Sequence, residues 1–108
     1  MKLVIAITQD EDTANLVSKL TEEGFRVTKL ASTGGFLKSG NTTLLIGVDD
    51  DKVEDLVKVI EKVCRPREVT TPATPMSLVE DVYMPYTYNI KVGGATIFIL
   101  DVDRYERI

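Results

Sequence analysis

"KLASTGGFLKSGNTTLLIGV", residues 29–48, has two ends that are typical of β-strands and a middle that is typical of a loop. The middle, "STGGFLKSGN" (32–41), contains three glycines and yet carries two large apolar side chains, Phe36 and Leu37. A loop gains nothing by exposing such side chains to water. The stretch therefore predicts two strands joined by a short loop, 32–41, whose apolar side chains contact something outside the loop.

Hydrophobic periodicity on both sides of this stretch predicts an order of strands and helices. Strands are predicted at 2–8, 25–31, 42–49 and 89–102, and helices at 9–24 and 51–64. The first helix is expected to bury Ala14, Leu16, Val17 and Leu20 and to stop at Gly24. The order βαββαβ predicts an α+β, ferredoxin-like fold. The length of 108 residues fits a single domain, 1–108.

The segment 65–88, "RPREVTTPATPMSLVEDVYMPYTY", interrupts this pattern. It contains all four prolines of the chain and shows little periodicity, so it is predicted to be a long loop. It leads into the last strand, where Gly93-Gly94 is expected to form a turn or bulge. We expect this loop to be the output of the protein, with an order that changes when a ligand binds.

The predicted strands are apolar on both of their alternating faces, as in "LVIAI", "LLIGV" and "TIFIL". Two helices can cover only one face of a four-stranded sheet, and leaving the other face in water is unfavourable at roughly 25 cal/mol per Å². Another copy of the chain is the simplest cover for the second face. The alternative is that the segment 65–88 folds back over it.

Composition excludes several function classes. The chain is 44% hydrophobic and 28% charged, with a formal net charge of −4, which argues against a duplex nucleic-acid partner. Without histidine there is no Ser-His-Asp or Cys-His nucleophile. The acidic run 49–51 is better explained by the start of a helix than by a metal site. The single cysteine, Cys64, and an N-terminus that reads as a strand and not as a signal peptide predict a cytoplasmic protein with no membrane segment.

Polar side chains gather around the short loop in a pattern that suits a nucleotide. Arg26 and Thr28 alternate onto the face opposite Phe25 and Val27, and Asn41 follows the loop. Arginine can hold a phosphate through two hydrogen bonds, an aromatic ring can stack on a base, and asparagine can match an adenine edge. Each residue also has a plainer interpretation. Arg26 could form a surface ion pair, Thr28 could simply favour a strand, and Asn41 could end the loop. Phe36 and Leu37 could be an oligomer contact.

The segments "FRVTKLASTGGFLKSGNTTLLIGV", "YMPY" and "VGGATIFILDVDRYERI" resemble the PII-like cyclic di-AMP receptors, the PstA or DarA family, over residues 1–108. The resemblance implies a homotrimer of ferredoxin-like subunits with one cyclic di-AMP in each cleft between neighbours, without catalysis and without a cofactor. A downstream protein partner is implied but not identified.

The resemblance also implies a set of ligand-binding residues. The expected set within one subunit is Arg26, Thr28, Gly35, Phe36, Leu37, Asn41 and Gly47. A neighbouring subunit is expected to contribute Gly93, Gly94 and Phe98. Near the C-terminus the family often has an amide, and this chain has Arg107 there instead, so the family's contact is either absent or replaced by a charge-assisted one.

Three other functions compete with this one. A PII-like sensor of ATP or ADP would use the same clefts, but the lengths of the two loops disfavour it. An acylphosphatase shares the order of elements but needs a phosphate-binding loop after the first strand, where this chain has the acidic "TQDED". A ligand-independent scaffold would use its long loop to bind a protein partner.

Overall fold

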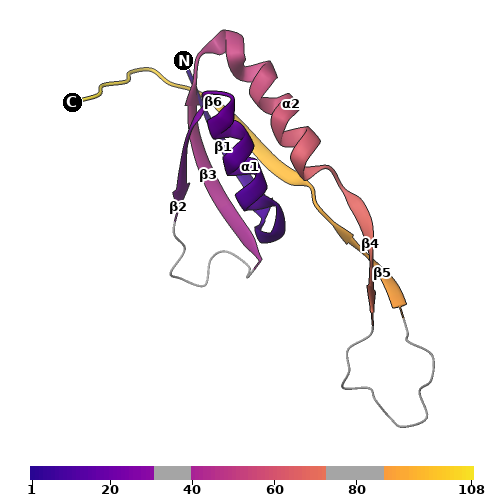
Figure 1. Ribbon diagram of the computed structural model, residues 1–108. Coiled ribbons are helices and arrows are strands. Elements are labelled where there is room, and N and C mark those ends of the chain that lie inside the picture. The colour runs from indigo at the N-terminus through magenta and orange to yellow at the C-terminus, as the bar shows by residue number, and fades with distance from the viewer. Residues whose placement is uncertain (31–39, 73–86) are drawn as a thin grey trace, which may run out of the picture.

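The computed structural model describes residues 1–30, 40–72 and 87–108. Figure 1 shows two helices lying on one side of a sheet and a separate two-stranded hairpin that extends away from it. The strands are β1 (Lys2–Gln9), β2 (Arg26–Leu30), β3 (Asn41–Val48), β4 (Arg67–Pro72), β5 (Thr87–Val92) and β6 (Ala95–Asp101). The helices are α1 (Asp10–Glu22) and α2 (Val53–Cys64), the second preceded by a 3₁₀ turn, η1 (Asp50–Lys52). None of the helices in these ranges is long and apolar enough to span a membrane.

The main sheet has the strand order β2-β3-β1-β6, and every neighbouring pair is antiparallel. This order, with both helices packed on one face, is the α+β arrangement that the βαββαβ pattern predicts. The hydrophobic core lies between the helices and this face. It consists of Val4, Ala6, Leu16, Leu20, Leu44, Ile46, Val48, Val53, Leu56, Ile60 and Cys64.

Helix α1 buries a slightly different stripe from the predicted one. Leu16 and Leu20 are buried and Val17 is half-buried, but Ala14 is exposed and Thr13 is buried instead. The Thr13 hydroxyl bonds to the Thr8 hydroxyl at 2.9 Å and donates to the Gln9 carbonyl at 3.0 Å. These hydrogen bonds satisfy a polar group that would otherwise be costly to bury.

The second face of the sheet carries three cross-strand rows of side chains, because directly opposed residues of antiparallel strands share a face. The rows run across β2, β3, β1 and β6. They are Arg26-Gly47-Leu3-Leu100, Thr28-Leu45-Ile5-Phe98 and Leu30-Thr43-Ile7-Thr96. No described element covers this face, which we call the open face, and Leu30, Phe98 and Leu100 are 42%, 52% and 44% exposed. Phe25 and Val27 lie on the opposite face against the core, as the alternation predicts.

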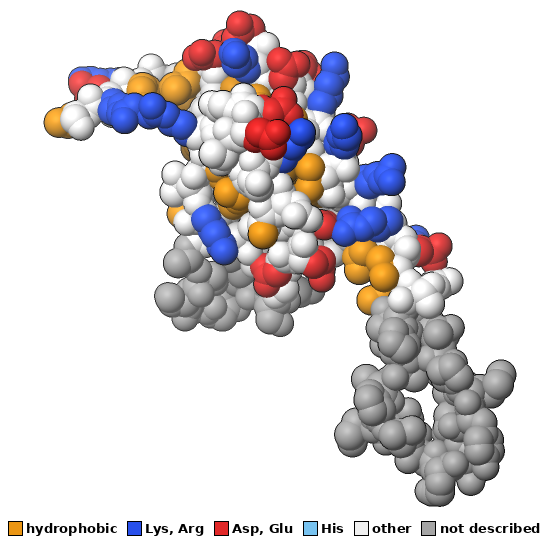
Figure 2. All heavy atoms as spheres, viewed as in Figure 1, with side chains coloured by type: hydrophobic (Ala, Val, Ile, Leu, Met, Phe, Trp, Pro, Cys, Tyr) orange, Lys and Arg blue, Asp and Glu red, His pale blue; other side chains and the backbone are white. Residues whose placement is uncertain are grey.

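The prediction of a long loop over 65–88 is wrong at both ends of that segment. Strands β4 and β5 pair there as an antiparallel hairpin, while 73–86 lies outside the described residues. One side of the hairpin is polar, with Glu68 opposite Lys91 and a hydrogen bond of 2.9 Å from the Thr70 hydroxyl to Asn89. The other side pairs Val69 with Ile90, which are 40% and 39% exposed. In Figure 2 hydrophobic side chains are visible where the hairpin leaves the body.

The predicted strand 89–102 is divided in two by Gly93 and Gly94. Their φ angles are +92° and +89°, a region that residues with a side chain rarely adopt, so the chain leaves the hairpin here and enters the main sheet. The two glycines differ in the space around them. A Cβ at Gly93 would clash with the Arg65 carbonyl and lie 2.8 Å from Arg67 Nη1, whereas a Cβ at Gly94 would meet only Pro66 Cγ at 4.0 Å.

We therefore expect Gly93→Ala and Gly94→Ala to destabilise the fold by different amounts. Gly94→Ala should cost about 1 kcal/mol, the conformational penalty alone. Gly93→Ala should cost about 3 kcal/mol or more, because the clash is with backbone and cannot be relieved by a side-chain rotation. Urea denaturation followed by circular dichroism measures both free energies of unfolding. Equal losses in the two variants would contradict the close packing assigned to Gly93.

Candidate functional site

A groove of ≈ 700 Å³ lies at one end of the open face. Its floor and walls come from the N-terminus, β2, β3, η1 and the C-terminal tail. The residues that line it include Leu3, Arg26, Thr28, Gly47, Lys52 and Tyr105. The volume falls within the range of roughly 300–1,000 Å³ that is usual for small-molecule sites.

The groove brings together three of the residues predicted to bind a ligand. Arg26 and Gly47 are directly opposed across β2 and β3, and Thr28 is two residues farther along β2 on the same face. A Cβ added at Gly47 would meet only Met1 Cε, at 3.7 Å, so nothing in the described chain requires a glycine there. The missing side chain leaves the backbone beside Arg26 open to a ligand.

Phe98 and Asn41 share the open face but lie away from the groove. Phe98 is on β6, at the opposite edge from Thr28, and three interstrand spacings of ~4.8 Å separate the two strands by about 14 Å. Asn41 opens β3 and pairs with Gln9, about 20 Å along the strand from Gly47. One chain alone therefore does not place Arg26, Asn41 and Phe98 around a single point.

The remaining predicted site residues lie elsewhere. Gly35, Phe36 and Leu37 fall outside the described residues. Arg107 is exposed in the tail and does not line the groove. The tail residue in the groove is Tyr105, which is 60% exposed and offers an aromatic face.

Sequence reasoning missed two groove residues, Lys52 and Tyr105. Lys52 ends a 3₁₀ turn that periodicity does not reveal, and Tyr105 belongs to a tail without secondary structure. The only sequence signal for them was their position: the basic Lys52 comes shortly after β3, and the aromatic Tyr105 comes shortly after β6.

Two ion pairs fix positive groups at the rim of the groove. The N-terminal amine of Met1 contacts Asp50 Oδ1 at 2.8 Å, and Lys2 binds Asp101 across β1 and β6. The hydrogen bond that Lys2 donates to Asp101 raises the pKa of Lys2, and the hydrogen bond that the N-terminal amine donates to Asp50 lowers the pKa of Asp50. Arg26 and Lys52 have neither an ion pair nor a side-chain hydrogen bond within the part of the chain that the structure describes.

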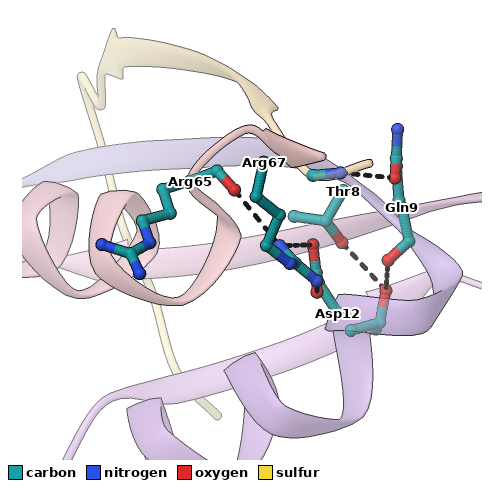
Figure 3. A network of polar contacts seen from close by, with 7 residues as sticks. Thr8, Gln9, Asp12, Arg65 and Arg67 are labelled. Atoms are coloured by element: carbon teal, nitrogen blue, oxygen red, sulfur yellow. Dashed lines mark hydrogen bonds and ion pairs between the residues drawn. The ribbon is translucent and has the colours of Figure 1, made fainter. Parts of the chain in front are cut away.

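A second polar cluster joins the base of the hairpin to the start of α1 (Figure 3). Arg67 donates to both carboxylate oxygens of Asp12, from Nη2 at 2.7 Å and from Nη1 at 3.3 Å, and Nη1 also donates to the Arg65 carbonyl at 3.1 Å. The Gly93 N–H donates to Gln9 Oε1 at 2.7 Å. Asp12 is only 3% exposed, so its charge depends on Arg67 for compensation. We call Gln9, Asp12, Arg67 and Gly93 the hairpin latch.

The same turn of α1 also contacts the chain that follows the short loop. The Asp10 N–H donates to the Gly40 carbonyl at 2.8 Å, and the Thr42 hydroxyl donates to the Asp10 carboxylate. The first turn of α1 therefore touches the start of β3 on one side and the base of the hairpin on the other.

Cys64 lies beneath the hairpin latch. It is 1% exposed, and its carbonyl accepts the Gly94 N–H. Burial, followed by the charge of Asp12, raises the pKa of the Cys64 thiol to about 11. The thiol is therefore protonated and unreactive at neutral pH as long as the base of the hairpin stays closed.

Within 1–30, 40–72 and 87–108, no three side chains of the metal-ligating types gather into a cluster. The groove contains the Arg26 guanidinium, the Lys52 ammonium, a hydroxyl and open backbone, which are groups that bind an anion, together with the Asp49 carboxylate.

Comparison with known proteins agrees with this chemistry. The sequence model of a family described as the cyclic-di-AMP receptor matches residues 1–108. A crystal structure of a functionally unknown protein from Pediococcus pentosaceus ATCC 25745 is 41% identical in sequence, with a TM-score of 0.75 over 99% of this chain and 96% of that chain. The similarity therefore includes the hairpin and the tail as well as the main sheet.

We expect Asp12→Asn to loosen the hairpin latch. The variant keeps the shape of the side chain but replaces a charge-assisted pair, worth roughly 1.5–3 kcal/mol, by weaker hydrogen bonds. The base of the hairpin should then open roughly tenfold more often or more. Labelling of Cys64, the only cysteine, by a thiol reagent at pH 8 measures this opening.

The matched control for this variant is Glu11→Gln, which removes an exposed charge from the same turn. Because loss of the Asp12 charge also lowers the pKa of Cys64, amide exchange at Gly93 and Gly94 provides a second measure that does not involve the thiol. Unchanged exchange at both glycines in Asp12→Asn would show that the latch does not hold the hairpin.

Proposed function

The chain belongs to the cyclic-di-AMP receptor family, whose sequence model spans all of it, and from this premise we propose that it binds cyclic di-AMP between the subunits of a homotrimer. In this proposal it acts as a non-enzymatic signalling protein with ligand-dependent ordering of the hairpin region as its output. The observation that carries the proposal is the groove on the open face, where Arg26, Thr28 and Gly47 lie together.

The chemistry of the groove suits one part of a cyclic dinucleotide. The Arg26 guanidinium is exposed and can donate two parallel hydrogen bonds to a phosphodiester. Thr28 adds a hydroxyl, and Gly47 lets the ligand approach the backbone of β3. In the proposal, Gly35, Phe36 and Leu37 of the short loop and Asn41 at its end hold an adenine, with Phe36 as the stacking surface.

The separation of Thr28 and Phe98 supports a site shared between chains. The two residues lie on opposite edge strands, about 14 Å apart, so one base cannot contact both within a single chain. A neighbouring chain that placed its β6 edge beside β2 would bring its own Phe98, Gly93 and Gly94 to the groove. The same arrangement would cover exposed apolar side chains such as Leu100.

The contacts of α1 support a route from the ligand to the hairpin. Its first turn bonds to Gly40 and Thr42, which follow the short loop, and to the hairpin through the latch. A ligand that fixes the short loop and Asn41 would therefore restrict the start of α1 and, through it, β4 and β5. A differential binding energy of only ~1.4 kcal/mol shifts such a two-state equilibrium tenfold.

Calorimetric titration of Arg26→Ala tests the binding site. We expect the affinity for cyclic di-AMP to fall about tenfold to a hundredfold, because a charge-assisted hydrogen bond is worth roughly 1.5–3 kcal/mol. Thermal stability should not change, since Arg26 is exposed. Arg65→Ala, which removes an exposed arginine outside the groove, is the matched control. If Arg26→Ala bound as tightly as the wild type, Arg26 would be a surface residue without a role in binding.

Hydrogen exchange tests the output. Cyclic di-AMP should slow amide exchange in β5 and at Gly93 and Gly94, relative to α2 as an internal reference, because the latch ties this segment to α1. In Asp12→Asn the ligand should still bind, but the protection of β5 should be reduced. Protection confined to 26–47 would mean that the signal leaves the protein by another route.

A further inference from the structure

The charges around the groove are not equivalent. Four positively charged groups line it, namely the Met1 amine, Lys2, Arg26 and Lys52. Carboxylates already bind two of them, since Asp50 contacts the Met1 amine and Asp101 contacts Lys2. In the described part of the chain, only Arg26 and Lys52 are left to interact with an incoming anion.

Lys52 occupies a different wall of the groove from Arg26. Arg26 begins β2 on the open face, whereas Lys52 ends η1, immediately after β3 and before α2. Arg26 lies directly opposite Gly47 near the end of β3, and Lys52 follows that end by four residues and lines the same groove. Among the described residues that line the groove, Asp49 is the one acidic residue. Its single negative charge is smaller than the combined positive charge of Arg26 and Lys52, so these three groups together are net positive.

We propose that Lys52 is a second phosphate-binding residue of this site, which contacts one phosphodiester of the ligand while Arg26 contacts the other. The proposal rests on cyclic di-AMP being the ligand. A cyclic dinucleotide carries two phosphodiesters held apart by its ring, so a second cation can bind the phosphodiester that Arg26 does not contact. A second cation on another wall of the groove matches this geometry.

The chemistry of the two cations predicts unequal contributions. Arginine binds a phosphate through a planar pair of donors, whereas lysine acts as a mobile, strongly hydrated point charge. Lys52 is exposed and loses side-chain entropy when it is held in place. Its contribution should therefore be smaller than that of Arg26 and more sensitive to ionic strength.

Calorimetric titration of Lys52→Gln with cyclic di-AMP tests the proposal. We expect a loss of affinity of about fivefold to tenfold at low salt, and a smaller loss at high salt, where the charge is screened. Lys52→Arg should bind within about twofold of the wild type, because it keeps the charge. The control is Lys62→Gln, which removes an exposed lysine of α2 outside the groove and should leave affinity and its salt dependence unchanged.

The outcomes separate this proposal from the function on which it rests. If the wild type binds cyclic di-AMP and Lys52→Gln binds it equally well at both salt concentrations, Lys52 is not a ligand contact and the function stands. If Lys52→Arg loses as much affinity as Lys52→Gln, the charge is not what matters and the proposal is also wrong. If the wild type does not bind cyclic di-AMP, the proposed function itself fails.

Discussion

Two helices can cover only one face of a four-stranded sheet, and most of what is distinctive in this protein follows from that limit. The covered face holds the core, in which Val4, Leu44 and Ile46 are buried against α1 and α2. The other face carries Leu45 and Ile5 at its centre and leaves Phe98 and Leu100 about half exposed. An apolar sheet face of this extent is unfavourable in water, so it favours association.

The open face has polar residues at both of its ends, and the groove lies at one of them. Arg26, Thr28 and Gly47 lie where β2 begins and β3 ends, and the tail brings Tyr105 to the same groove. In the proposal, the apolar middle of the face serves assembly and the end with the groove binds the ligand. In the proposed homotrimer the two roles meet, because the edge strand that covers the face would also complete the groove.

The first turn of α1 contacts both segments that respond to the ligand in the proposal, namely the chain after the short loop and the base of the hairpin. Asp12 is buried and depends on Arg67, and Asp10 bonds to Gly40 and Thr42. A buried charge with a single partner gives little stability in itself, but it fixes one arrangement of the hairpin base. In the proposal, a change at either end of this turn would be transmitted through these hydrogen bonds and not through the apolar core.

The sequence predicts the main sheet and its faces well, because both depend on local periodicity. The register confirms the predicted alternation, with Arg26 and Thr28 on the open face and Phe25 and Val27 facing the core. The hairpin could not be predicted, since a proline and two threonines weaken the hydrophobic alternation in β4 and its partner strand lies beyond 73–86.

Three further features depend on contacts that no local pattern reveals. From the sequence, Asp12 is simply an acidic residue at the start of a helix, because its partner Arg67 lies 55 residues away in the chain. Thr13 replaces Ala14 in the buried stripe because the Thr8 hydroxyl is present to bond with it. Lys52 reaches the groove through a 3₁₀ turn that the sequence alone does not distinguish from the start of a helix.

Native mass spectrometry of the wild-type protein, recorded without ligand and with cyclic di-AMP, tests the central claim most directly. The claim is that the ligand binds between copies that cover each other's open face. We predict an assembly of three 12.0 kDa chains that takes up one cyclic di-AMP per chain and does not take up cyclic di-GMP under the same conditions. A single chain that bound cyclic di-AMP, or a trimer that bound none, would contradict the account.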